Sequence, residues 1–213
     1  MAAQLTALSI MQDAPVIPVI VLHDVNHAVS MAKALVAGGI RVLEVTLRTP
    51  QGLPSIEAIA KAVPDAIVGA GTVRSAADAK AAAAAGARFA VSPGYTGAVG
   101  QACRDANLPL LPGVATSSEI MQAMDDGFKE LKFFPALQAG GINMLKAWQG
   151  PFGEIRFCPT GGITPTNAPD FLALKNVVCV GGSWLVPTDT VERGDWEHIT
   201  MLAREAAALP RKD

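Results

Sequence analysis

Lys132 is the one cationic residue in the apolar run LKFFP, residues 131–135. An unperturbed lysine has a pKa of about 10.4, so the neutral amine that attacks carbonyl groups is rare at neutral pH. Desolvation lowers a lysine pKa by as much as about 3 to 5 units in the most buried cases, which turns a dormant charge into a nucleophile. The alternative is that the stem of Lys132 lies over apolar surface at a strand end and has no chemical role.

A second set of reactive groups lies in the segment RVLEVTLR, residues 41–48. Because side chains alternate along a strand, Glu44, Thr46 and Arg48 are predicted to share one face. A carboxylate beside an amine moves the protons that imine chemistry requires, so Glu44 is the candidate general acid/base. The planar fork of Arg48 suits a substrate carboxylate held by two parallel hydrogen bonds. An internal ion pair that only fills the protein interior is the alternative for this strand.

Glycine-rich stretches follow several apolar runs. TGGI at 160–163 and GGS at 181–183 come after the last two of these runs. In parallel barrels the loops after the seventh and eighth strands often bind phosphate through backbone N–H groups. Thr72 follows VGAG, and Pro93 lies in SPG, at the ends of the third and fourth runs. Glycines in such places permit close approach of the backbone to a ligand, although a tight turn explains them equally well.

Strand-like and helix-like segments alternate along the whole chain. Strands are predicted at 16–22, 42–47, 66–70, 89–92, 110–114, 131–134, 155–158 and 177–180. Helices are predicted at 28–36, 53–63, 76–85, 97–106, 118–126, 142–148, 166–174 and 196–208. This order predicts a (β/α)8 TIM barrel. A doubly wound open sheet is disfavoured because VLHDVNH, residues 21–27, lacks the usual glycine fingerprint after the first strand. The first twelve residues predict a short helix that plugs the barrel floor or packs on a neighbour.

Composition excludes several classes of function. The chain has 213 residues, 50% of them hydrophobic and 17% charged, and a net charge of -2, so we expect one globular domain over 1–213 that does not bind nucleic acid. Cys103, Cys158 and Cys179 lack metal-ligand spacing and are expected to be buried thiols in a reducing compartment. His23 and His27 lack a third ligand, so no metal is predicted. No basic leader and no membrane-length apolar run is present, which favours a soluble, cytoplasmic protein.

The chain as a whole resembles the class I 2-keto-3-deoxy-6-phosphogluconate (KDPG) aldolases, small barrels that also act as 4-hydroxy-2-oxoglutarate (KHG) aldolases. The resemblance covers nearly the whole length. It is carried by VIPVI at 16–20, AKALVAGG at 32–39, EVTLRT at 44–49, VGAGTV at 68–73, KFFPA at 132–136, FCPTGGI at 157–163 and GGSWLVP at 181–187.

The resemblance implies a role for each matching residue. Lys132 would form an imine with the substrate ketone without any cofactor, and Glu44 would be the general acid/base. The pyruvyl pocket would be formed by Arg48, Thr72, Pro93, Phe134 and Thr160. The phosphate site would be formed by Gly161, Gly162, Gly181, Gly182 and Ser183. The implied substrate is a phosphorylated 2-keto acid of the Entner–Doudoroff pathway, and the implied assembly is a homotrimer.

Three alternative functions remain open at this point. One is a 2-dehydro-3-deoxy-6-phosphogalactonate aldolase, because the N-terminus and the segments after the first strand and after Lys132 diverge from the family. A second is a lysine-independent sugar-phosphate isomerase or epimerase in which Glu44 abstracts a proton. A third is a non-catalytic module that binds phosphorylated metabolites, although such a module has little use for a desolvated amine.

Overall fold

The computed structural model describes residues 5–211. Its strands are β1 (Val16–Ile20), β2 (Val42–Thr46), β3 (Ile67–Gly71), β4 (Ala90–Val91), β5 (Leu110–Leu111), β6 (Gly113–Val114), β7 (Glu130–Phe133), β8 (Arg156–Pro159) and β9 (Val180–Gly182). All of the pairings between them are parallel, in the orders β5-β4-β3-β2-β1-β9 and β6-β7-β8. The predicted order of strands is therefore confirmed, with one strand more than expected.

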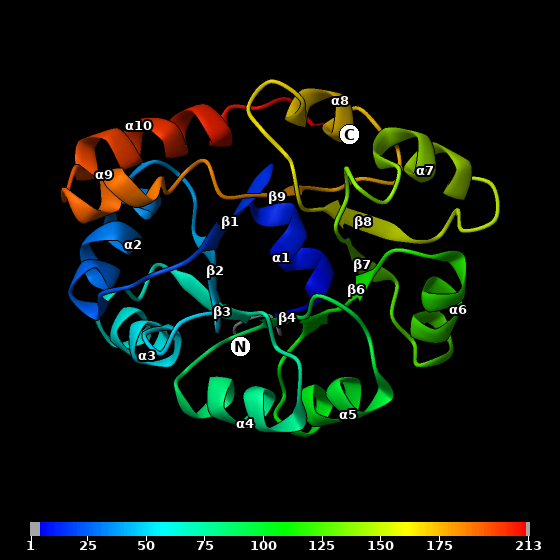
Figure 1. The fold of residues 1–213 in the computed structure, drawn as a ribbon, viewed down its shortest axis with the longest axis horizontal. Helices are drawn as coiled ribbons and strands as arrows, with labels where there is room; N and C mark the ends of the chain where they lie inside the picture. Colours follow the sequence, from blue (N-terminus) through cyan, green and yellow to red (C-terminus); the bar gives the residue numbers. More distant parts are fainter. Residues whose placement is uncertain (1–4, 212–213) are drawn as a thin grey trace.

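The additional strand arises at Pro112, which separates β5 from β6. Proline has no N–H to give to a neighbouring strand. Its carbonyl still accepts a hydrogen bond from the Lys132 backbone N–H at 2.8 Å. The chain therefore passes from β5, in the first sheet, to β6, in the second, while it stays hydrogen-bonded to β7. At the far edges, bridges join Phe157 to Val177 and Thr160 to Gly181, which places β8 beside β9. The result is a curled parallel sheet with helices around its outside (Figure 1).

The helices follow the predicted alternation. They are α1 (Ala7–Asp13), α2 (Ala28–Ala37), α3 (Gly52–Ala62), α4 (Ala76–Ala84), α5 (Gly97–Asp105), α6 (Ser117–Asp125), α7 (Gly141–Trp148), α8 (Ala168–Leu172), α9 (Thr188–Glu192) and α10 (Trp196–Ala207), with the 3-10 turn η1 (Val25–His27) before α2. The short helix α9 was not predicted, because five residues after Pro187 are too few to show a helical period.

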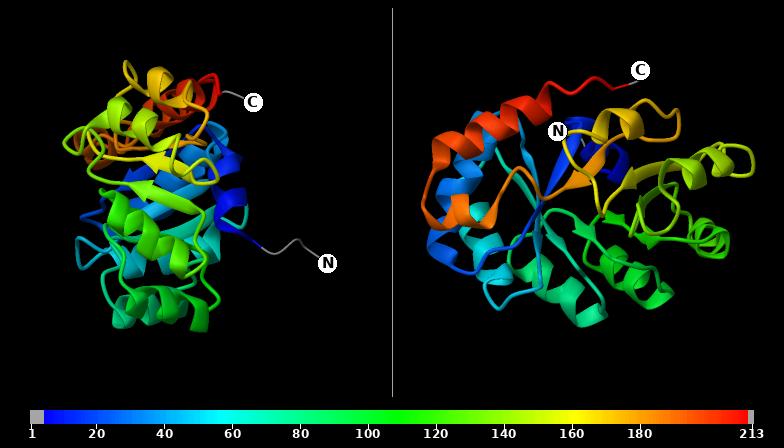
Figure 2. Two further views of the ribbon diagram at one scale, coloured as in Figure 1. Left: turned by 90° about the vertical axis from the view of Figure 1, so that its right-hand side faces the viewer. Right: turned by 45° about the horizontal axis from the view of Figure 1, so that its top comes forward.

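Buried apolar residues form two clusters, one on each face of the curled sheet. The larger cluster fills the space between the strands and the outer helices. The smaller one lies on the inner face, where Ile10 and Met11 of α1 pack with Ile17 of β1 and Val42 of β2. Helix α1 thus covers one end of the curled sheet, as the two further views show (Figure 2). This confirms the predicted plug over the residues described and leaves the opposite end for polar side chains.

Among residues 5–211, the helices are all too short or too polar to cross a membrane.

Candidate active site

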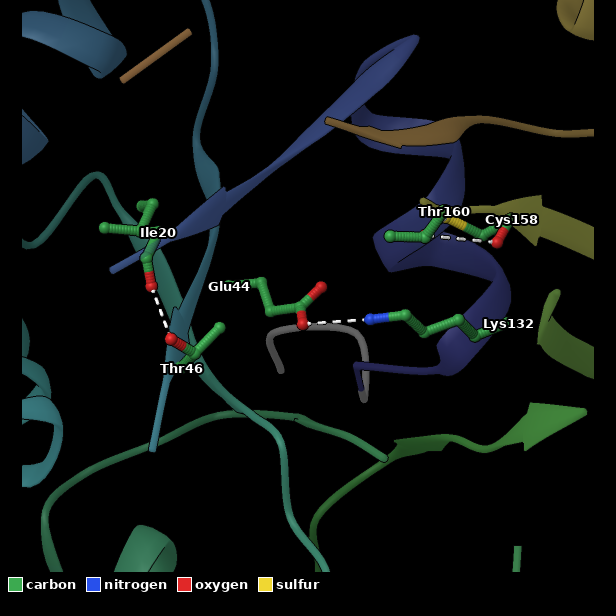
Figure 3. A network of polar contacts seen from close by, with 6 residues as sticks. All are labelled: Ile20, Glu44, Thr46, Lys132, Cys158 and Thr160. Carbon is green, nitrogen blue, oxygen red and sulfur yellow. Dashed lines mark hydrogen bonds and ion pairs between the residues drawn. The ribbon is translucent and has the colours of Figure 1, made fainter. Parts of the chain in front are cut away.

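Lys132 and Glu44 meet inside the curled sheet. Lys132 projects from β7 and Glu44 from β2, and the lysine Nζ lies 3.2 Å from Glu44 Oε1 (Figure 3). Only 7% of the lysine side chain and 4% of the glutamate side chain are exposed. The amine also lies 5.4 Å from the centre of the Phe134 ring. Lys132 therefore does not extend its amine to bulk solvent, and the interpretation as a surface-covering stem is wrong.

The position of Glu44 follows from strand alternation along β2. Val42 belongs to the inner apolar cluster. Leu43 and Val45 belong to the outer one. Glu44 and Thr46 then fall on the inner face, where the Thr46 hydroxyl donates to the Ile20 carbonyl at 2.9 Å. The inner face of β2 thus changes from apolar to polar with distance from the α1 plug.

Glycines in β3 make room for the side chains that face them. A Cβ on Gly71 would lie 2.4 Å from Glu44 Oε1, and a Cβ on Gly69 would lie 2.4 Å from Cδ1 of the Phe89 ring. Both distances are far below van der Waals contact. The sequence interpretation, in which these glycines admit a ligand or a turn, missed this role. A GxG pattern one strand away from the glutamate was the available signal, but it becomes informative only once the strand order is known.

The predicted carboxylate-binding residues lie just beyond the strand ends. Arg48 is exposed and lies in the turn after β2, which ends at Thr46, so it is not part of the strand face on which it was predicted. Thr72 follows β3 directly and has a φ of 61°. A β-branched residue in this left-handed region is a true outlier, and such strain concentrates at functional sites. Pro93 is half-buried, two residues beyond β4.

The predicted phosphate-binding residues divide between a loop and a strand. Gly161 and Gly162 lie in the turn after β8, with φ values of 103° and 75°. Gly181 and Gly182, in contrast, are part of β9 and pair with β1, so their prediction as loop residues is wrong. Neither position has room for a side chain. A Cβ on Gly181 would lie 2.2 Å from Thr160 Oγ1, and a Cβ on Gly182 would lie 1.8 Å from the Trp184 ring. Ser183 is exposed directly after the strand.

The remaining candidates are placed as follows. Thr160 follows β8 and is buried, with its Oγ1 3.9 Å from Cys158 Sγ. Phe134 follows β7 and is half-buried beside the amine. All three cysteines are free and buried, as predicted. Burial, with a contribution from the Cys158 thiol, raises the pKa of Cys179 well above its ordinary value. No cluster of three or more metal-ligating side chains occurs in the described part of the chain.

A buried lysine amine in contact with one buried carboxylate, in the interior of a curled parallel sheet, is the arrangement expected of a class I aldolase, a lyase that forms an imine with its carbonyl substrate. Comparison with known proteins agrees with this class. Residues 8–202 match the family model for KDPG and KHG aldolase. The chain belongs to this family.

The relatives match the chain over nearly its full length. The KHG/KDPG aldolase of Escherichia coli strain K12 is 57% identical over 201 residues, which cover 94% of each chain. Among solved structures, a KDPG aldolase from Legionella pneumophila, with pyruvate captured as a covalent carbinolamine, has a TM-score of 0.94 at 45% identity and covers 97% of this chain and 100% of its own. A KDPG aldolase of Zymomonas mobilis with 3-phosphoglycerate has a TM-score of 0.93 at 48% identity, with 98% of each chain covered.

Proposed function

We propose that this chain cleaves 2-dehydro-3-deoxy-6-phosphogluconate to pyruvate and glyceraldehyde 3-phosphate, and 4-hydroxy-2-oxoglutarate to pyruvate and glyoxylate. The observation that carries the proposal is the buried 3.2 Å contact between Lys132 Nζ and Glu44 Oε1. The names of the relatives support the substrates, and the carbinolamine in the Legionella relative supports the covalent chemistry. The reacting groups come from the side chains themselves, so no cofactor is needed.

The first half of the reaction forms the imine. The Lys132 ammonium passes a proton to Glu44 across their contact, and the free amine attacks the C2 carbonyl carbon of the substrate. The carbinolamine then loses water, with Glu44 returning a proton to the departing hydroxyl. The product is a protonated imine, which draws electrons from C3.

The second half breaks and remakes bonds at C3. Glu44, directly or through one water, takes the proton of the C4 hydroxyl, and the electron pair of the C3–C4 bond moves to the imine nitrogen. This step releases the aldehyde and leaves an enamine. Glu44 then delivers a proton to C3, and water hydrolyses the pyruvyl imine to regenerate Lys132.

The two ends of the substrate are held by different parts of the site. We infer that Arg48, Thr72 and the Pro93 backbone hold the pyruvyl carboxylate, and that Phe134 and Thr160 line the pocket around the imine. The 6-phosphate is held by the segments that contain Gly161, Gly162, Gly181, Gly182 and Ser183. Ser183→Ala is expected to raise KM for the phosphorylated substrate more than KM for 4-hydroxy-2-oxoglutarate, and equal rises would argue against this phosphate site.

The wider setting is also proposed. The bridges between β8 and β9 and the short passage through Pro112 support closure of the sheet into a single-domain (β/α)8 barrel over 1–213. The family resemblance supports a homotrimer, which sedimentation equilibrium tests. The three buried free thiols support a reducing, cytoplasmic location. A place in the Entner–Doudoroff pathway follows from the proposed substrate.

Trapping with borohydride tests the proposal directly. Incubation with pyruvate and borohydride is expected to leave one reduced pyruvyl adduct, which mass spectrometry of peptides places on Lys132. The matched control is Lys61, whose side chain is 74% exposed and pairs with Glu57 on α3. Lys132→Met should abolish trapping and Lys61→Met should not.

The same assays separate the alternative functions. An isomerase or epimerase that does not use the lysine gives no adduct on Lys132. A binding module gives no pyruvate in a coupled lactate dehydrogenase assay, whatever it binds. A galactonate-specific aldolase shows a higher kcat/KM for 2-dehydro-3-deoxy-6-phosphogalactonate than for the gluconate-derived substrate.

A further inference from the structure

The turn after β8 contains three consecutive peptide planes whose carbonyl groups are all engaged. The Thr160 carbonyl accepts from the Ala136 amide at 2.8 Å, and the Gly161 carbonyl accepts from the Leu137 amide at 3.2 Å. The third carbonyl, that of Gly162, accepts instead from a side chain, Nδ2 of Asn167, at 3.1 Å. The first two planes are thus held by the backbone of the segment that follows Lys132, and the third by one carboxamide.

The N–H groups of the second and third planes are left available. Because a peptide unit is planar and trans, fixing a carbonyl also fixes the direction of the N–H on the opposite side of that plane. The first plane carries the Gly161 N–H, which faces the Gly181 carbonyl across the bridge between Thr160 and Gly181. The other two N–H groups belong to Gly162 and Ile163, and neither has a hydrogen-bond acceptor within residues 5–211. Exposed amides of successive residues form a concave site for an anion. The carbonyl partners therefore fix the directions of these two donors.

Asn167 pairs with Thr164, three residues earlier, and its side chain also reaches Gly162. It precedes α8, yet its side chain makes no capping bond to that helix. The carboxamide turns back along the chain, where Oδ1 accepts from the Thr164 amide at 2.9 Å while Nδ2 donates to Gly162. Gly162 has a φ of 75°, and in glycine the opposite sign of φ is almost as accessible. Without the carboxamide, the Gly162–Ile163 plane is held by no other hydrogen bond to its carbonyl among the described residues.

We propose that Asn167 is a positioning residue for the phosphate end of the substrate: its carboxamide holds the Gly162 carbonyl and thereby orients the Ile163 N–H, with that of Gly162, toward the 6-phosphate. The inference rests on the proposed function. It adds a residue that does not touch the substrate and that acts through the backbone of the turn.

The test compares two variants of the same turn. Asn167→Ala removes the bond to Gly162. Thr164→Ala removes only the hydrogen bond that the backbone N–H of Asn167 donates to Thr164 Oγ1, at 3.3 Å. The hydrogen bond from the Asn167 side chain to the Gly162 carbonyl remains. For Asn167→Ala we expect KM for 2-dehydro-3-deoxy-6-phosphogluconate to rise about 10-fold, which is the upper range for the loss of one net hydrogen bond. The changes in kcat and in KM for 4-hydroxy-2-oxoglutarate should be smaller. Thr164→Ala is expected to behave as the wild type with both substrates.

Several results would overturn the role of Asn167. These are an unchanged KM for the phosphorylated substrate, equal rises for both substrates, or a rise in Thr164→Ala as large as in Asn167→Ala. If the alanine variant does not fold, Asn167→Asp serves, because its carboxylate still accepts from Thr164 but has no proton to donate to Gly162.

A measurement without turnover separates this inference from the proposed function. Inorganic phosphate is titrated into each protein and its binding is followed by phosphorus NMR line broadening. Weaker phosphate binding in Asn167→Ala than in Thr164→Ala supports the proposed role of Asn167, and equal phosphate binding in the two variants refutes it. If the wild type binds phosphate in this manner but cleaves neither substrate, the proposed function alone fails.

Discussion

Substitution of Gly71 by alanine is expected to disable the site although it replaces none of the proposed catalytic residues. The added Cβ would lie 2.4 Å from Glu44 Oε1, 2.7 Å from Cγ and 2.9 Å from Cδ. Relief of these contacts requires the carboxylate to move by about 1 Å, a displacement that costs a catalytic site about 100-fold in rate. Oε1 is also the atom that contacts the Lys132 amine at 3.2 Å, so the displacement acts on the proton-transfer path itself.

The assay is steady-state kcat for pyruvate release, measured together with thermal unfolding. Gly71→Ala should lower kcat by about 100-fold and should cost about 1 to 3 kcal/mol of stability through overpacking. Two glycines provide controls. Gly69→Ala strikes the Phe89 ring at 2.4 Å and should cost stability without a comparable loss in kcat. Gly150→Ala, whose Cβ meets nothing within 4 Å, should change neither.

A double-mutant cycle shows whether the loss passes through the carboxylate. In a Glu44→Gln background the general acid/base is already absent, so the addition of Gly71→Ala should lower kcat much less than it does in the wild type. Glu44→Asp, with a shorter side chain, should tolerate the new Cβ better than Glu44 itself. Full activity in Gly71→Ala, or an equal loss in both backgrounds, would refute the reasoning.

Three further outcomes are expected. Glu44→Gln alone should lower kcat by about 100-fold to 10,000-fold, the worth of one general acid/base, and an unchanged kcat would remove Glu44 from the mechanism. Thr72→Gly should be no less stable than the wild type, because it removes a β-branched residue from the left-handed region, where the strain costs about 1 to 3 kcal/mol. Its KM for substrate should nevertheless rise. A marked fall in Tm would contradict this expectation. Burial raises the pKa of the Cys103 thiol to about 11. The folded protein keeps that proton where the unfolded chain loses it, so the free energy of unfolding should fall between about pH 9 and about pH 11, at up to about 1.4 kcal/mol per pH unit for this one group. Cys103→Ala should flatten this slope in urea denaturation, and an unchanged slope would exclude the thiol as its source.

The alternation of elements was accessible from the sequence because it depends on local periodicity. Apolar runs separated by helical segments predicted the strand order, and α1 was expected from the first twelve residues. Two of the errors occur where neighbouring strands override local preference. Pro112 divides one expected strand into two, and β9 begins at Val180 and includes both glycines that were predicted to form a loop.

The sequence also identified Lys132 and Glu44 individually, since a charged residue in an apolar strand needs a partner wherever the chain folds. Their chemistry predicted that they are partners, and the structure confirms the contact. The sequence did not determine its geometry, because the two residues lie 88 residues apart and their contact depends on how far the sheet curls. The sequence likewise did not determine the space that Gly71 leaves for Glu44 or the hydrogen bond from Asn167 to Gly162, because both depend on side-chain directions and not on residue types. Local propensity thus decided the elements and the reactive groups, and tertiary structure decided which of these groups meet, because register and curvature depend on packing throughout the molecule.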